Sequence, residues 1–168
     1  ETSMQQIQED AQLQSQIVEG IYNDENIEQV LHNCAQKVLK RLGVTRFLLL
    51  FCDQKLYEYN FFYQSQISNQ RPLNFNLEGL KEVDAKLLER STQAVGVENL
   101  EEDLRFFNWR SSLLQAGLRS VLVSNCSPQK VPDVILIIGS EINRSWTTVE
   151  KELVQVVAQQ IGAIFRQW

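Results

Sequence analysis

The sequence predicts an α/β domain of the α+β type, in which about six strands form one mostly antiparallel sheet and a helix lies at each end of the chain. Two apolar runs, residues 118–124 and 133–139, are rich in β-branched side chains and bounded by glycine, as buried strands are. A third run, residues 56–64, alternates aromatic and polar side chains, which is the period of a half-exposed strand. Strands that follow one another through tight turns pair antiparallel.

Length and composition bound the number of domains and the environment. The 168 residues suit one domain, and the formal net charge of −5 disfavours general nucleic-acid binding. Three cysteines without a CxxC pair fit a reducing cytoplasm. The sequence shows no signal peptide and no apolar run long enough to span a membrane. Because Met4 lies inside the chain, we expect a cytoplasmic piece of a longer protein.

The first helix is expected over residues 3–22. Its apolar side chains alternate between spacings of three and four, which predicts a seam for a partner helix. The seam consists of Met4, Ile7, Ala11, Val18 and Ile21, with Gln14 at one position. A polar break separates this helix from a second one, whose apolar face begins at Ile27 and which ends at Gly43. We therefore divide the chain into a linker or dimerisation helix, residues 1–22, and a domain, residues 23–168.

The middle of the chain alternates strands with short helices. Residues 46–52 form an apolar strand that a turn joins to the aromatic alternating strand. The polar segment that follows has a short edge strand near Phe75. Helices are expected over residues 80–90 and 104–116, with a short strand at 94–97 between them.

The last helix begins at a capping box, because Thr147 and Glu150 have the spacing in which each side chain caps the other's backbone. Apolar side chains then recur as far as Trp168 and spread over roughly 220° of the helix circumference. Packing on one core needs an arc of only about half that width. We therefore expect this helix to have two partners, of which the domain's own core supplies one.

The carboxyl half has a recognisable order of elements. A strand opens at Gly117-Leu118-Arg119-Ser120, an apolar strand ends at Gly139, and an Arg144-Ser145-Trp146-Thr147 loop leads into the capped helix. This order resembles the second half of a GAF domain, a small-molecule-sensing module of many signalling proteins. The resemblance covers residues 24–168.

The resemblance carries implications for both fold and function. It implies that the amino- and carboxyl-terminal helices lie on one face of the sheet and that helical loops lie on the other. It also implies a regulatory, sensory role in a cytoplasmic signal-transduction protein, such as the sensor histidine kinase or response regulator of a two-component system. The bound state of a small molecule would then be relayed through the terminal helices.

Specialised branches of the GAF family depend on residues that this chain lacks. Many photosensory members hold a bilin through a cysteine in the middle helix, and residues 105–116 contain none, so we predict no covalent bilin and no other cofactor. The cyclic-nucleotide motif ends in an Asp-Glu pair, which occurs here only at 24–25, ahead of the first helix of the domain, so that motif is missing. His32 is the sole histidine, and Cys34, two residues further on, points elsewhere on a helix, so no metal site is predicted.

A ligand pocket would need an aromatic wall and polar anchors. The residues that could form them are Tyr57, Tyr59, Phe61, Phe75, Phe107 and Trp109 as the wall, with Arg105 and Arg110 as anchors. The alternative is that the aromatic side chains belong to an ordinary core and the arginines to the surface, because aromatic residues at strand spacing are usually core.

Two rival functions remain open beside the sensor. One is a dimerisation and relay module whose pocket is filled. The other is a thiol-dependent methionine sulfoxide reductase of the same fold, in which Cys126, near a predicted loop, would be the exposed thiol. We expect this chain not to be an enzyme. We also expect a homodimer through both terminal helices, with an interface of Met4, Ile7, Ala11, Val18, Ile21, Leu153, Val157, Ile161 and Ile164.

Overall fold

The computed structural model describes residues 3–22 and 26–166, without the side chains of residues 17, 18 and 20–22. The elements follow the chain as α1 (Met4–Tyr22), α2 (Ile27–Leu42), β1 (Arg46–Asp53), β2 (Glu58–Gln66), β3 (Leu77–Glu78), α3 (Glu82–Arg90), β4 (Val95–Val97), α4 (Phe107–Gln115), β5 (Ser120–Asn125), β6 (Val134–Ser140) and α5 (Thr148–Arg166). The strands form one six-stranded sheet in the order β3-β2-β1-β6-β5-β4, and all neighbours pair antiparallel.

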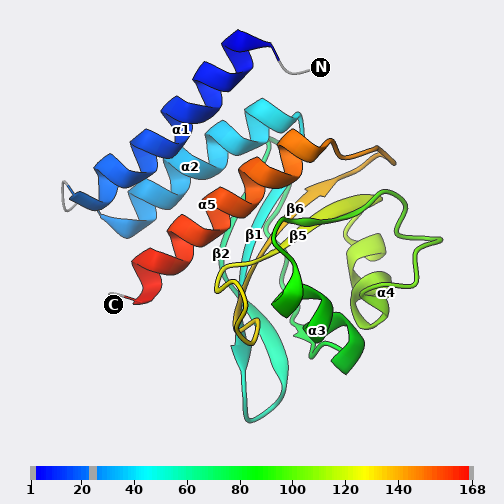
Figure 1. Ribbon diagram of the computed structural model, residues 1–168. Helices are drawn as coiled ribbons and strands as arrows, with labels where there is room; N and C mark the ends of the chain where they lie inside the picture. The colour runs from blue at the N-terminus through cyan, green and yellow to red at the C-terminus, as the bar shows by residue number, and fades with distance from the viewer. Residues whose placement is uncertain (1–2, 23–25, 167–168) are drawn as a thin grey trace.

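The helices divide between the two faces of this sheet. The long helices α1, α2 and α5 cover one face, which we call the helical side, and the short helices α3 and α4 cover the other, which we call the α3/α4 side (Figure 1). The predicted fold is therefore confirmed, including the placement of the terminal helices on one face. The expected strand near Phe75 is displaced to β3, and α4 is shorter than the helix expected over 104–116.

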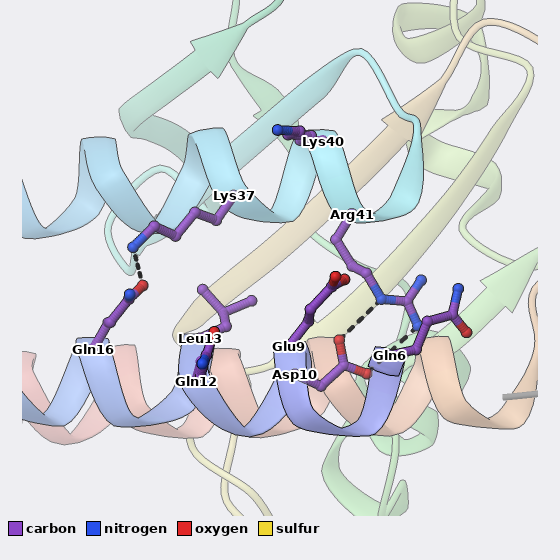
Figure 2. Close-up of a pocket in the computed structure, with 9 residues that line it drawn as sticks. All are labelled: Gln6, Glu9, Asp10, Gln12, Leu13, Gln16, Lys37, Lys40 and Arg41. Atoms are coloured by element: carbon purple, nitrogen blue, oxygen red, sulfur yellow. Dashed lines mark hydrogen bonds and ion pairs between the residues drawn. The ribbon is translucent and has the colours of Figure 1, made fainter. Parts of the chain in front are cut away.

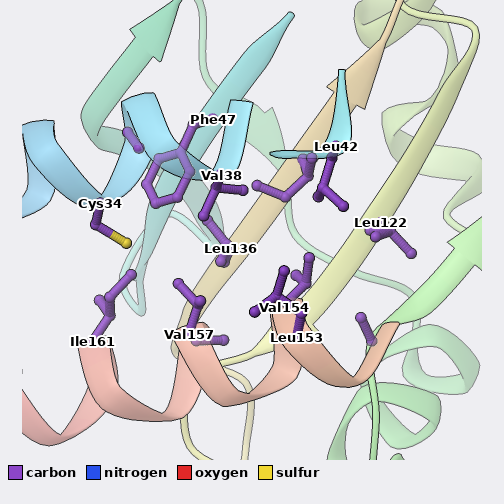
Figure 3. Close-up of a cluster of buried hydrophobic side chains, with 14 of the residues drawn as sticks. Cys34, Val38, Leu42, Phe47, Leu122, Leu136, Leu153, Val154, Val157 and Ile161 are labelled. Carbon is purple, nitrogen blue, oxygen red and sulfur yellow. The ribbon is translucent and has the colours of Figure 1, made fainter. Parts of the chain in front are cut away.

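Each side of the sheet has its own hydrophobic core, because side chains alternate along the central strands. On the helical side, Phe47 and Leu49 of β1 meet side chains of α2 and α5 such as Val38 and Val157 (Figure 3). On the α3/α4 side, Leu48 and the alternate residues of β1 that point the same way pack with Trp109, Leu113 and Leu88. The two cores together bury nearly every apolar side chain of β1, β5 and β6.

The helix α5 begins at the predicted capping box. The hydroxyl of Thr147 accepts a hydrogen bond from the Glu150 N–H at 3.1 Å, and the Glu150 carboxylate accepts one from the Thr147 N–H at 2.8 Å. One turn from its carboxyl end, Gly162 lies directly against the backbone carbonyl of Cys126, where no larger residue fits. The helix is thus held at its start by hydrogen bonds and near its end by close contact with Cys126, the residue that follows β5.

The second partner of α5 is helix α1 of the same chain, so the wide apolar arc of α5 is covered without a second molecule. Helix α1 packs on both α2 and α5 and contributes Leu13 to the core of the helical side. The interface residues expected on α5 are all buried there: Leu153, Val157, Ile161 and Ile164. The sequence shows that α5 needs a second partner, but not that α1 folds back to supply it. The side chains of Val18 and Ile21 lie outside the described residues, and so does Trp168.

A β-bulge in β2 changes which aromatic residues share a face. The pairing with β1 shifts between Leu49 and Leu50, which face Tyr63 and Phe61, so Phe62 is the extra residue. Tyr59 and Phe61 point to the α3/α4 side, whereas Tyr63 lies on the helical side, edge-on to Phe47 at 6.1 Å between ring centroids. Strict alternation would place Tyr63 with Phe61, and the bulge is why that expectation is wrong.

The three cysteines are unpaired and buried. Burial of Cys34 and Cys52 is as predicted, but Cys126, expected near an exposed loop, is fully buried on the helical side. Burial raises the pKa of the Cys34 thiol to about 12 and raises the pKa of Cys126 as well. Of the helices in the described part of the chain, none is both long and apolar enough to cross a membrane.

Candidate functional site

The α3/α4 side contains most of the aromatic residues that the sequence suggested for a ligand wall. At its centre, the Trp109 ring stacks on Phe106 at 5.6 Å between centroids and meets the edge of Tyr59 at 5.5 Å. Both polar tips are satisfied: the indole N–H of Trp109 donates to the Glu78 carbonyl, and the Tyr59 hydroxyl donates to the Pro132 carbonyl. These rings are fully enclosed, so they are core as well as candidate wall.

The other proposed wall residues lie further out. Phe61 and Phe75 meet edge to face at 5.8 Å at the border of the core. The Tyr57 ring lies outside it, half exposed over Gly79, with its hydroxyl donating to the Leu80 carbonyl at 2.5 Å. The structure therefore brings Phe61 and Phe75 together and separates Tyr57 from them.

A cationic rim surrounds Phe107, which is 50% exposed. The ammonium of Lys81 lies 4.7 Å from the ring centroid and the guanidinium of Arg110 lies 5.2 Å from it. The Arg110 guanidinium also donates to the Asp103 carbonyl. The sequence suggested Phe107 and Arg110 for the site, but it did not identify Lys81.

The second proposed anchor, Arg105, is engaged by a neighbour that sequence reasoning missed. Its guanidinium donates to the Asp103 carboxylate at 2.5 Å and to the Gly96 carbonyl at 2.8 Å. The hydrogen bond and charge of Arg105 lower the pKa of Asp103 below its usual range. An aspartate two residues before an arginine is the only signal in the sequence for this pair.

Several buried polar atoms on the α3/α4 side have no hydrogen-bond partner. They include the Asp84 carboxylate oxygen Oδ2 on α3 and the Nε atoms of Arg110 on α4 and Arg46 on β1. Arg46 is paired with Gln66 across the strands, on the same face as Leu48, and the Gln66 amide oxygen is also unpartnered. Leaving a buried polar group unsatisfied costs about 1–3 kcal/mol, and more for a charged one. These atoms can therefore accept hydrogen bonds from, or donate them to, a molecule that enters this side.

Two short helices cover this side. Helices α3 and α4 have nine residues each, and neither has a side-chain hydrogen bond at its N-cap. The N-cap of α4 is Phe106, which is held at φ 57°. A bulky side chain in this left-handed region costs of order 1 kcal/mol and is retained only where the surroundings enforce it. Both helices therefore lack the N-terminal side-chain cap that stabilises a helix by about 1 kcal/mol.

A concavity lies between α1 and α2, on the helical side (Figure 2). It encloses about 390 Å³ and is lined by Leu13 and by polar or charged side chains of both helices. The Arg41 guanidinium bonds the Asp10 carboxylate at 2.9 Å, and the Lys37 ammonium donates to the Gln16 amide oxygen. Because these groups satisfy one another across the groove, it is explained by the docking of α1 on α2.

The thiols are divided between the two sides. Cys52 packs in the core of the α3/α4 side, next to Tyr59, whereas Cys34 and Cys126 lie in the core of the helical side. Burial raises the pKa of Cys52, and the charge of Asp133 adds to the effect. Cys52 is therefore the thiol that shares a face with the aromatic wall.

Comparison with solved structures identifies the fold. The chain is similar to the phycoerythrobilin-bound GAF domain of a cyanobacterial phytochrome, with a TM-score of 0.77, 17% identity and 95% of each chain covered. It is also similar to a phycocyanobilin-bound GAF domain of a cyanobacterial phytochrome, with a TM-score of 0.73, 17% identity and 94% of each chain covered.

A third similar structure is the GAF domain of a phosphoenolpyruvate-protein phosphotransferase from Coxiella burnetii, with a TM-score of 0.73, 15% identity and 95% and 94% of the two chains covered. No protein-family model matches the sequence, and no curated protein matches it either. The chain thus has the fold of GAF domains, as the order of its elements suggested.

These structures correct one expectation about cofactors. The prediction that the chain binds no covalent bilin is contradicted, because domains of this fold and size are bilin-bound. The prediction considered a thiol only in the middle helix. The structure shows that Cys52, far from that helix in the sequence, lies on the face that α4 covers.

Proposed function

We propose that this chain is the sensory domain of a larger signal-transduction protein, such as a two-component sensor kinase or response regulator. A small molecule binds on its α3/α4 side, and the long helices relay the bound state. The observation that supports this most directly is the set of unpartnered buried polar atoms on the α3/α4 side, which belong to Asp84, Arg110 and Arg46, together with the short, uncapped helices that cover this side. The chain itself acts as a regulator and not as a catalyst.

The chemistry of this side favours a ligand with an extended π system and charged groups. Tyr59, Phe61 and Trp109 offer aromatic contacts, and the unpartnered atoms of Arg46 and Arg110 offer cationic donors. A bilin has both features, and the similar cyanobacterial domains bind one. A bilin is therefore the first candidate, with Cys52 as the thiol on that face.

A route from the ligand side to α5 passes through the bulge in β2. Phe61 points to the α3/α4 side, and the next residue, Phe62, contacts Phe165 near the end of α5 at 4.8 Å between ring centroids. A ligand that moves Phe61 therefore also moves Phe62, because a bulge residue lacks the paired hydrogen bonds that hold a regular strand. The last turn of α5 would carry the displacement to whatever follows it.

The test is to add biliverdin or phycocyanobilin to the purified chain and record absorption, thermal stability and zinc-induced fluorescence on a denaturing gel. We expect a shifted, enhanced visible band and a raised melting temperature. A fluorescent band on the gel should be lost in Cys52→Ser and kept in Cys34→Ser, which makes the same change on the helical side. Binding that survives Phe61→Ala and Trp109→Phe with unchanged affinity would place the ligand elsewhere and contradict the proposal.

The strongest alternative is a relay module with a filled pocket, and the enclosed stack of Phe106, Trp109 and Tyr59 favours it. If neither bilin alters the absorption spectrum or the melting temperature, and cyclic nucleotides and small carboxylates do not either, this alternative replaces the sensor. The position of Cys126 disfavours the reductase alternative, because this thiol is fully buried in the core of the helical side and not on the face that the short helices cover.

A further inference from the structure

The irregular segment that joins β2 to β3, residues 67–76, packs on the α3/α4 side of the sheet. All of this segment is described, and it forms neither helix nor strand. Its two inward apolar side chains, Leu73 and Phe75, pack against the core of that side, and the Phe75 ring meets Phe61 edge to face at 5.8 Å between centroids. The segment therefore supplies part of the aromatic wall from outside the sheet.

Side chains of the sheet hold this segment in place. The Gln64 side-chain amide donates to the Leu73 carbonyl at 2.8 Å and accepts from the Leu73 N–H at 2.7 Å, as a neighbouring strand would. The Arg46 guanidinium donates to the Arg71 carbonyl at 2.9 Å. The main chain from residue 68 to residue 75, all of it described, makes no hydrogen bond to the main chain of a strand. Gln64 therefore holds the backbone of the segment through a donor and an acceptor at once.

In the position that the segment occupies, three buried polar atoms at this end of the sheet have no hydrogen-bond partner. Two belong to the sheet, the Nε atom of Arg46 and the Oε1 atom of Gln66, and these residues are paired across β1 and β2. The third is the Oε1 atom of Gln70 in the segment itself, whose amide nitrogen donates to the Glu141 carboxylate. Burying such atoms unpaired costs free energy, and opening the segment recovers it because water then bonds them. The segment is therefore poised to open.

We propose that this segment is a gate to the ligand site on the α3/α4 side and that Gln64 is the positioning residue that keeps the gate closed. The proposal rests on the proposed function, because a gate has an effect only where a ligand enters. Leu73 and Phe75 move with the gate, so its opening uncovers Phe61 and takes away part of the wall. The fraction of chains with an open gate then sets how fast a ligand enters.

Gln66 provides a matched comparison for Gln64. Both side chains are amides on the same face of β2, two residues apart, where they pair with Arg46 and Leu48 of β1. The Gln64 amide bonds the segment at both of its ends, whereas the Gln66 amide oxygen has no partner. Replacing each glutamine by methionine keeps the length of the side chain and removes its hydrogen-bonding groups. The two variants therefore separate the bonds to the segment from a general effect on the strand.

Limited proteolysis of the chain without ligand tests whether Gln64 holds the segment. Chymotrypsin cleaves after Phe75 only when the segment opens, so the cleavage rate reports the open population. We expect Gln64→Met to be cleaved there about tenfold faster than wild type, and Gln66→Met to be cleaved no faster, because it only removes an unpartnered oxygen. Mass spectrometry identifies the cleaved bond, and circular dichroism melting establishes that both variants are folded. Equal cleavage rates in Gln64→Met and Gln66→Met overturn the proposal.

Stopped-flow absorbance with biliverdin then tests whether the segment is the entrance. Association should be about tenfold faster with Gln64→Met than with Gln66→Met, because the open population is larger by that factor. A purely structural role of Gln64 would lower the melting temperature and leave the association rate unchanged, and that result overturns the gate. If biliverdin binds to neither variant nor wild type, the proposed function fails. Unequal cleavage rates then still support Gln64 as the residue that holds the segment, and equal rates overturn it.

Discussion

The helices on the two sides of the sheet differ in length and in the capping of their ends. On the helical side, α2 has sixteen residues with an Asn26 side-chain cap and ends at Gly43 in the left-handed conformation, and α5 has a complete capping box. On the α3/α4 side, both helices are about half as long and neither has a side-chain cap. Among the described residues, the unpartnered buried polar atoms of Arg46, Gln66, Asp84 and Arg110 belong to the α3/α4 side, whereas that of Gln160 belongs to a long helix and that of Gln70 to a loop.

This difference suggests a division of labour within one small domain. A layer that must open for a ligand cannot also be the most stable part, because opening costs the free energy of every contact that it breaks. A layer that relays a displacement must instead move as a unit, which requires long, capped and tightly packed helices. The predictions below compare the two sides directly, beginning with the largest expected effect.

Gly162, which lies directly against the Cys126 carbonyl, should be the position that tolerates a larger side chain least. Gly162→Ala places a methyl group against the Cys126 carbonyl, at a cost of about 3 kcal/mol, of which the higher helix propensity of alanine offsets about 1. Urea unfolding should therefore show a net loss of about 2 kcal/mol. Gly79→Ala on the other side meets only the half-exposed Tyr57 ring, which can swing away, and should cost less than half as much. Equal losses would mean that the two sides are equally rigid.

Native-state thiol labelling should show which side opens. Cys34, Cys52 and Cys126 are all buried and all have raised pKa values, so labelling requires local opening. Cys52 should react about tenfold faster than the other two, which corresponds to about 1.4 kcal/mol less for opening the α3/α4 side. Mass spectrometry of digested samples gives the three rates, with labelling in urea as the reference. Faster reaction of Cys34 or Cys126 would reverse the assignment of the mobile side.

Loss of the capping box should weaken the helical side alone. Thr147→Ala removes the hydroxyl that caps Glu150 and should lower the free energy of unfolding by about 1 kcal/mol. Thr148→Ala deletes the same group at the next, exposed position and serves as the control. The labelling rate of Cys126 should rise in Thr147→Ala while that of Cys52 stays unchanged. A parallel rise of both rates would show that the two layers unfold as one unit.

The smallest expected effect is a pH dependence on the α3/α4 side. Arg105 lowers the folded-state pKa of Asp103, so the pair contributes stability above the unfolded value of about 3.9 and loses it as the pH falls through the lowered folded value. Asp103→Asn should be less stable than wild type at pH 7 and indistinguishable from it at the acid end of that range. Glu82→Gln, at an exposed ion pair with Lys86, controls for loss of surface charge. A stability difference that does not change with pH would contradict the coupling.

Local signals in the sequence account for most of the fold. Each of these signals depends on residues that are close together in the chain. They are the alternation in β2 before the bulge, the apolar runs of β5 and β6, the capping box at Thr147 and the helix-ending Gly43. Such signals act through backbone geometry and burial on one face, so they can be recognised from the sequence alone. Part of the aromatic wall could be predicted for the same reason, because Tyr59 and Phe61 follow the two-residue spacing of a strand.

Only the tertiary structure decided where those elements meet. Four features depend on contacts between segments that are distant in the sequence. They are the bulge at Phe62 that turns Tyr63 away, the docking of α1 that covers α5, the burial of Cys126 and the position of Cys52. The same holds for the unpartnered atoms of Asp84 and Arg46. The sequence by itself determined which faces of the helices and strands are apolar and where most elements begin and end. Which apolar face covers which, and which polar groups are left without partners beneath it, followed from packing in three dimensions, because a polar group becomes unsatisfied only when distant residues exclude water from it.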